Sequence, residues 1–136
     1  MNIKTVKTLT DFFNSKKEIE IAILYGSFAK GTETNESDID LAVSLASPLT
    51  AQDKISYIDE LSLLTHKTID LVDLREIHVP LSQEVFLTGK VIKNKNKSFW
   101  EWLIRRMIYE VSDFLPMRRK EQINRIKKFI GNKSHE

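Results

Sequence analysis

Two short β-rich runs, residues 19–26 and 37–45, lie close together in the chain and restrict how it can fold. The first run, IEIAILYG, is apolar and stops at a glycine, as a buried strand does. The second, SDIDLAVSL, alternates polar and apolar residues with a period of two, which predicts a strand with two different faces. Between them, SFAKG has room only for a short helix that ends at Gly31, followed by a polar loop.

Apolar residues at helical or strand spacing predict the remaining elements. Residues 3–17 have helical spacing, residues 50–66 form an amphipathic helix with Thr50 as its cap, and residues 79–90 form a helix that ends at Gly89. Strands are expected over 68–74 and, at an edge, over KVIK. Helices that alternate with three or four strands indicate an α/β or α+β fold.

The C-terminal part of the chain reads as two helices. From Lys97 onward the apolar residues are stepped by three and one, and Pro116 is expected to break or kink this pattern before a second helix. The apolar set of the first helix is Trp100, Leu103, Ile104, Met107, Ile108, Val111, Phe114 and Leu115. Trp100 and Trp102 cannot share one helix face, so at least one of them is expected to be exposed.

Composition narrows the class of protein. A length of 136 residues indicates one domain, and the absence of cysteine excludes a disulfide framework and thiol catalysis and fits a cytoplasmic location. We expect no secretory signal and no membrane span, because no apolar stretch is long enough. Residues 93–136 hold 12 Lys and Arg against 5 Asp and Glu. This basic tail is compatible with a nucleic acid, an acidic partner, or a solvated helix face.

Asp38 and Asp40 are the first candidates for chemistry. At positions i and i+2 of a strand, both side chains leave the same face. Two adjacent carboxylates repel each other, and a hard divalent cation such as Mg²⁺ resolves this while leaving coordination sites for phosphate and water. Two such ions can activate an attacking oxygen and stabilise a leaving one in an in-line displacement.

A third carboxylate and a phosphate-binding turn complete the predicted site. If the strand at 68–74 runs parallel to the one at 37–45, Asp70 lies beside the pair; Asp73 faces the other way and is the alternative. An antiparallel first strand then delivers Gly26 and Ser27 to the same edge, where backbone N–H groups and the serine hydroxyl can hold a phosphate. The site is therefore predicted to hold a metal and a nucleoside triphosphate.

The stretch LYGSFAKGTETNESDIDLAV resembles the GS-x10-DxD motif of the DNA polymerase beta nucleotidyltransferase superfamily. TIDLVDLREIHVPLSQEVFLTGKVI is similar to its continuation in minimal nucleotidyltransferases, the MNT antitoxins of HEPN–MNT toxin–antitoxin pairs. The likeness covers roughly residues 19–115. It implies a small mixed sheet flanked by helices, with triphosphate held by Gly26 and Ser27 and metal, Mg²⁺ or Mn²⁺, held by the catalytic carboxylates Asp38, Asp40 and Asp70.

The resemblance also implies a reaction: transfer of AMP from ATP to a HEPN ribonuclease toxin, which neutralises the toxin. We expect residues 1–96 to form the nucleotidyltransferase core and residues 97–136 to form a helical extension of the same domain that docks the partner. Two alternatives remain open. One is a transferase, acting alone or as a homodimer, that modifies RNA or a small molecule, and the other is an antitoxin that occludes the toxin sterically.

Overall fold

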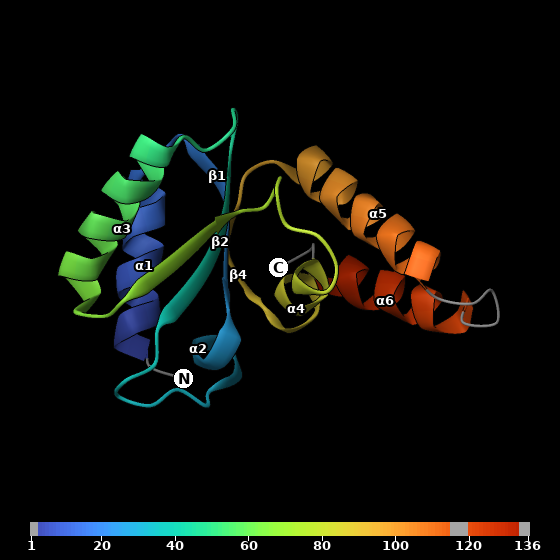
Figure 1. Cartoon of the computed structure of the whole chain (residues 1–136), viewed down its shortest axis with the longest axis horizontal. Helices are drawn as coiled ribbons and strands as arrows, with labels where there is room; N and C mark the ends of the chain where they lie inside the picture. Colours follow the sequence, from blue (N-terminus) through green and yellow to red (C-terminus); the bar gives the residue numbers. More distant parts are fainter. Residues whose placement is uncertain (1–2, 115–119, 134–136) are drawn as a thin grey trace.

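The core of the computed structural model, which describes residues 3–114 and 120–133, is a four-stranded sheet with helices on both faces (Figure 1). The predicted elements are present, with bounds within two residues of those expected. Their order is α1 (Ile3–Ser15), β1 (Ile19–Tyr25), α2 (Gly26–Lys30), β2 (Ile39–Leu45), α3 (Ala51–Thr65), β3 (Ile69–Asp73), α4 (Leu81–Thr88), β4 (Lys90–Asn94), α5 (Lys97–Phe114) and α6 (Lys120–Lys133). Leu115 and the break expected at Pro116 lie outside the described residues.

The sheet is mixed, and its strand order is β3-β2-β1-β4. β2 and β3 run parallel and are joined through α3, whereas β1 is antiparallel to both of its neighbours, β2 and β4. The condition for placing Asp70 beside the Asp38–Asp40 pair, a parallel β3, is therefore met. As a consequence, the end of β1 and the beginnings of β2 and β3 meet at one edge of the sheet.

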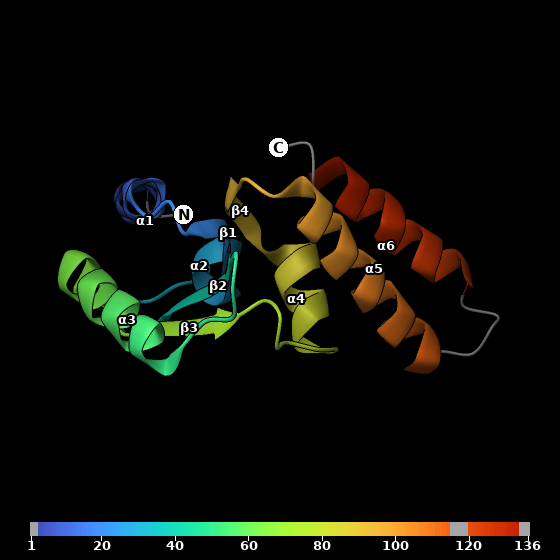
Figure 2. The same cartoon turned by 90° about the horizontal axis from the view of Figure 1, so that it is seen from above.

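Each face of the sheet has its own apolar core. Helices α1 and α3 cover one face, and α4 and α5 cover the other, with α6 lying alongside α4 and α5 (Figures 1 and 2). The alternation in β2 separates the two cores, since Ile39, Leu41 and Val43 belong to the first and Ala42 to the second. The residues before and after Leu41 thus point toward α4, which places Asp40 on that face.

Local signals account for several helix ends. Thr50 accepts a hydrogen bond from the Asp53 backbone N–H at 3.1 Å, as predicted for an N-cap. Gly31 ends α2 in the left-handed region, with φ of 72°. His66 ends α3 in the same region, with φ of 58°. In the part of the chain that the structure describes, none of the helices combines the length and the apolar character that crossing a bilayer requires.

Helix α5 buries its apolar stripe within this chain. Its six members from Trp100 to Val111 are at most 9% exposed, because they pack against α4, the sheet and α6. Ile104 and Ile108, each 9% exposed, are the most accessible of these six residues. The exposed aromatic residues of α5 are instead Trp102 and Tyr109, at 48% and 69%, so the two tryptophans do lie on different faces.

Arg106 fastens α5 to the loop that follows β3. Its guanidinium donates hydrogen bonds to the carbonyl oxygens of Arg75 (2.7 Å), Leu74 (2.9 Å) and Ile77 (2.9 Å). Glu110, one turn later, accepts from the Val79 backbone N–H at 3.1 Å and lies 3.7 Å from the Arg106 Nε. The planar, five-donor guanidinium suits this role, because it can satisfy three carbonyls that diverge from one loop.

Replacing Arg106 by lysine should destabilise the fold. An ammonium group keeps the charge but cannot reach three carbonyls in this fork geometry, so we expect the free energy of unfolding to fall by about 2–4 kcal/mol. Urea unfolding, followed by circular dichroism, measures the change. The neighbouring exposed Arg105 provides the control, since Arg105→Lys should leave the midpoint nearly unchanged. Equal midpoints for both variants would contradict the clamp.

Candidate functional site

The predicted site residues assemble where β1 ends and β2 and β3 begin. Across the parallel pair Asp40 is in register with Asp70, and across the antiparallel pair it is in register with Tyr25, the last residue of β1. Asp38 directly precedes β2 instead of lying within it, and its side chain is exposed. Asp40 is thus the central carboxylate, with Asp70 on one side and the turn at Gly26 on the other.

Gly26 is required at this turn for two reasons. Its φ of 70° lies in the left-handed region, which strains any other L-residue except in special cases. In addition, a Cβ at this position would collide with the Asp40 carboxylate. The backbone therefore passes directly over a carboxyl group, and Ser27 follows in α2 with its side chain half-buried.

Burial and neighbouring negative charges raise the pKa of Asp40. The pKa of Asp40 is raised to about 6, first by burial and then by the negative charges of Asp70, Asp38 and Glu84. The carboxyl groups of Asp40 and Asp70 are also close enough to share a hydrogen bond, which requires a proton on one of them. The pKa of the Tyr25 hydroxyl is raised as well, by burial and by Asp70, Asp40 and Glu84.

Glu84 is the acidic residue that sequence reasoning missed. It lies in the first turn of α4 and contributes charge to the Asp40 environment. Its Oε1 is 3.6 Å from the Lys30 Nζ, which belongs to the end of α2. Acidic residues are common in the first turn of a helix, because their negative charge interacts favourably with the positive end of the helix dipole. Nothing in the local sequence therefore marks Glu84 as a site residue.

Asp73, the alternative third carboxylate, has a structural role at the other end of β3. It pairs in register with Val43, and its oxygens accept hydrogen bonds from the backbone N–H groups of Leu49 (3.1 Å) and Arg75 (2.9 Å). The Arg75 guanidinium lies at this far edge too, where it donates to the Leu45 carbonyl at 2.9 Å. Asp73 is therefore not beside Asp40, whereas Asp70 is.

The donor set suits a hard divalent cation, although the side chains are not converged on one. Among residues 3–114 and 120–133, no group of three or more His, Cys, Asp or Glu side chains is arranged to hold a metal ion. The pKa of Asp40 is nevertheless raised, first by burial and then by repulsion from neighbouring carboxylates, and a divalent cation bound there would favour the ionised carboxyl. Carboxylates are also the protein ligands that Mg²⁺ prefers, so the residues fit the ion chemically.

Comparison with known proteins gives a curated relative and similar folds. The protein adenylyltransferase MntA of Shewanella oneidensis is 33% identical over 87 residues, which are 64% of this chain and 60% of MntA. The match thus spans less than two thirds of that relative. A crystal structure of a toxin–antitoxin with AMP-PNP has a TM-score of 0.68 at 23% identity, covering 93% of this chain and 99% of the other.

A second solved structure has the same overall fold. It holds the tri-AMPylated Shewanella oneidensis HEPN toxin in complex with an MNT antitoxin, and the matching chain has a TM-score of 0.61 at 22% identity, with 93% of this chain and 99% of the other covered. The sequence profile described as "Polymerase beta, Nucleotidyltransferase" matches residues 7–98, which contain every predicted site residue. The chain therefore belongs to the polymerase beta nucleotidyltransferase family.

Proposed function

We propose that this protein is a metal-dependent adenylyltransferase that moves AMP from ATP to a HEPN-family ribonuclease toxin and thereby neutralises it. The observation that carries the proposal is the placement of the Gly26 turn directly over Asp40, with Asp70 in register beside it. The relative MntA is a protein adenylyltransferase, and the HEPN toxin in one structurally similar complex is tri-AMPylated, which supports this acceptor class.

In the proposed site Asp38, Asp40 and Asp70 hold Mg²⁺ or Mn²⁺, and two ions suit the number of carboxylates. The bound metal would neutralise the carboxylates and the triphosphate and favour charge development at phosphorus. Backbone N–H groups of the turn and the Ser27 hydroxyl bind phosphate oxygens, and Gly26 allows this close approach because it has no side chain.

The reaction follows from these positions. The oxygen of the acceptor hydroxyl forms a bond to the α-phosphorus of ATP, the bond from that phosphorus to the bridging oxygen breaks, and pyrophosphate leaves. The hydroxyl proton passes to an exposed carboxylate of the cluster, Asp38 or Asp70. Asp40 is half-buried, so we assign it to metal binding and not to proton transfer.

The acceptor is proposed to be a folded protein because MntA is a protein adenylyltransferase and the HEPN toxin in a structurally similar complex is tri-AMPylated. In this proposal residues 1–96 form the nucleotide-holding core and residues 97–136 dock the partner. Two rivals make different predictions: a transferase acting on RNA or a small molecule labels those acceptors, and a steric antitoxin neutralises its partner without modifying it. Incubation of the purified protein with labelled ATP and each acceptor distinguishes the three.

Metal and ATP together should stabilise the fold, and Asp40→Asn should remove that effect. At ligand concentrations near 100 times the dissociation constant, we expect about 2.7 kcal/mol of stabilisation in the wild type. Scanning calorimetry with and without Mg²⁺–ATP measures it, with Asp59→Asn, an exposed carboxylate on α3, as the control. An unmoved melting temperature in the wild type would show that the proposed metal–ATP site is wrong.

Without ligands the Asp40→Asn variant should be more stable than the wild type at pH 7.5, by on the order of 1 kcal/mol after allowing for solvent screening. The folded-state pKa of about 6 lies above the ordinary value of 3.8, so the ionised carboxyl destabilises the fold above pH 6. This difference should disappear as the pH falls from 6 toward 4. A difference that grows on acidification would contradict the assigned repulsion.

The phosphate turn is tested by Ser27→Ala and Gly26→Ala. Losing one hydroxyl contact should weaken ATP binding by about 0.5–1.5 kcal/mol, whereas a Cβ at Gly26 should abolish binding, since it collides with Asp40 and strains the turn. Isothermal titration calorimetry in the presence of Mg²⁺ gives the dissociation constants. Ser56→Ala, on an exposed position of α3, is the matched control. Equal, negligible effects from both site variants would place the phosphate elsewhere.

The double variant Asp38→Asn plus Asp40→Asn should lose AMP transfer but keep its complex with the toxin. The carboxylates act on the reactants, and the docking helices are separate from them in the fold. Intact mass spectrometry of the co-expressed partner should show one or more AMP units with the wild type and none with the double variant. A partner that is neutralised by the wild type yet carries no AMP would instead favour the steric mechanism.

A further inference from the structure

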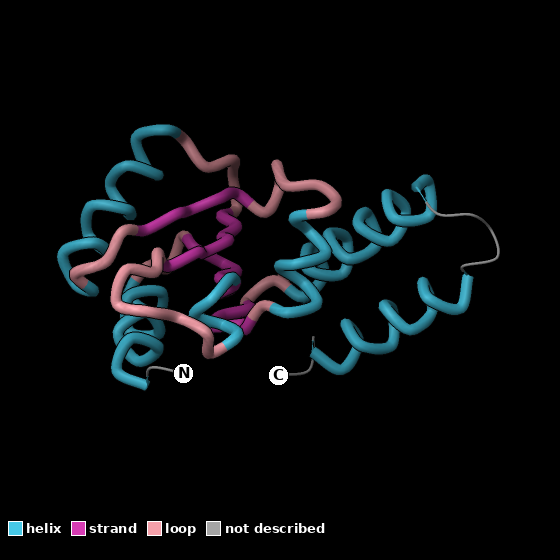
Figure 3. The backbone as a smooth tube through the Cα atoms, turned by 60° about the horizontal axis from the view of Figure 1, so that its bottom comes forward, coloured by secondary structure: helices cyan, strands magenta, loops and turns pink. Residues whose placement is uncertain are grey.

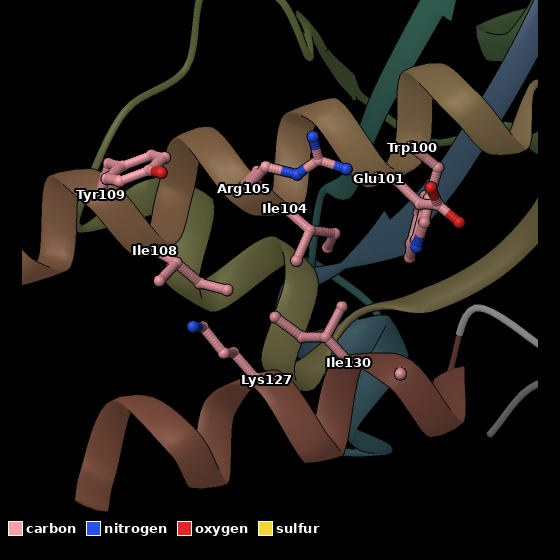
Figure 4. A pocket seen from close by; sticks show the side chains of 9 residues that line it. Trp100, Glu101, Ile104, Arg105, Ile108, Tyr109, Lys127 and Ile130 are labelled. Carbon is pink, nitrogen blue, oxygen red and sulfur yellow. The ribbon is translucent and has the colours of Figure 1, made fainter. Parts of the chain in front are cut away.

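Helices α5 and α6 form one side of the molecule (Figure 3). An open groove of about 590 Å³ lies between them (Figure 4). Two parallel rows of α5 residues, each spaced by four, border it. Trp100, Ile104 and Ile108 form an apolar floor, and Glu101, Arg105 and Tyr109 form a polar rim. From α6 the groove is lined by Lys127, Ile130 and Gly131.

The shape of this groove fits a helix better than a small molecule. Rows of side chains spaced by four residues form the ridges against which a second helix packs. From Trp100 to Tyr109 the groove follows α5 for about 13 Å, or two and a half turns. Because it is bordered by only two helices and stays open, it would not enclose most of a small ligand, as small-molecule pockets do.

The groove carries two basic side chains, Arg105 and Lys127, against one acidic side chain, Glu101, and this excess of positive charge favours an acidic guest. Arg105 and Lys127 are exposed, come from opposite helices, and within the described residues form no ion pair. At the other end, Figure 4 shows the Trp100 ring extending from α5 toward α6; its Nε1 donor is buried and has no acceptor in the part of the chain that the structure describes. Because this atom is not accessible from the groove, the preference for an acidic guest rests on Arg105 and Lys127.

The exposed aromatic residue at the rim also indicates a protein-binding surface. Tyr109 is 69% exposed, and tyrosine is enriched among the residues that dominate binding energy at protein interfaces. The basic residues of the groove also belong to the most positively charged part of the sequence, residues 93–136. Long-range attraction would therefore guide an acidic segment toward this surface before contact.

We propose that the groove between α5 and α6 binds an amphipathic helix of the acceptor protein, with apolar residues on Tyr109 and on the accessible edges of Ile104 and Ile108, and an acidic residue near Arg105 and Lys127. This inference rests on the proposed function in one respect: the bound helix is taken to belong to the HEPN-family acceptor. It assigns partner recognition to a surface built by α5 and α6 alone, whereas the carboxylates come from β2, β3 and the residue before β2.

Gly131 provides a sharp test, because a Cβ at this position would meet no atom within 4 Å. Gly131→Phe should fill the groove, and Gly131→Ala should leave it open while favouring helix formation in α6. Arg105→Glu reverses the charge, and Arg105→Lys keeps it. Titration calorimetry of the full-length chain with the purified HEPN-family protein should give a dissociation constant at least about tenfold weaker for Gly131→Phe and Arg105→Glu, and unchanged for the two controls.

The Mg²⁺–ATP-dependent melting shift should be the same in all four variants, which separates docking from the nucleotide site. Hydrogen exchange of the partner should show protection of one helix with apolar and acidic residues, lost with Gly131→Phe. Unchanged dissociation constants for both disruptive variants, or no binding by the wild type, would overturn the inference. So would a dimer of this chain alone, detected by sedimentation, that Gly131→Phe dissociates. If the partner binds as expected but receives no AMP, the proposed function fails and the groove assignment stands.

Discussion

Tyr25 and Asp40 face each other across the antiparallel β1–β2 ladder, and the chain must turn immediately after Tyr25. The turn passes so close to the Asp40 carboxyl that only glycine fits at position 26. Because β3 runs parallel to β2, the same carboxyl also meets Asp70. One register therefore brings together a backbone turn suited to an anion and carboxylates suited to a cation, which are the two requirements of a metal–nucleotide site.

The opposite ends of β2 and β3 lie beside the loop to which the C-terminal helix α5 is attached. There Asp73 and Arg75 are occupied with backbone groups, and Arg106 of α5 closes over the loop that follows β3. Asp73 and Arg106 thus bind backbone groups of the protein itself, in contrast to the other edge, where burial and the neighbouring carboxylates raise the pKa of Asp40. This difference separates a stabilising network from a site prepared for ligands.

Most of the fold was predictable because its signals are local. The period of two in β2, the glycine that ends β1, the Thr50 cap and the apolar spacing of α5 each depend on a few neighbouring residues. The parallel direction of β3 was only a condition for Asp70 to reach the pair, and the structure meets it. The extent to which the apolar stripe of α5 is buried was not predictable in this way. Its burial depends on packing against α4 and α6, which contact it only in the folded chain.

The sequence alone determined the elements, the Gly26–Ser27 turn and the carboxylates Asp38, Asp40 and Asp70, because strand alternation and turn chemistry are properties of adjacent residues. Only the tertiary structure decided that Asp40 pairs with Asp70, that Asp73 serves the backbone, and that Glu84 adds its charge to the cluster. The tertiary structure also decided that α5 and α6 leave a groove between them. The physical reason is that strand register and helix packing bring together residues that are far apart in the chain. Local sequence patterns do not specify such contacts.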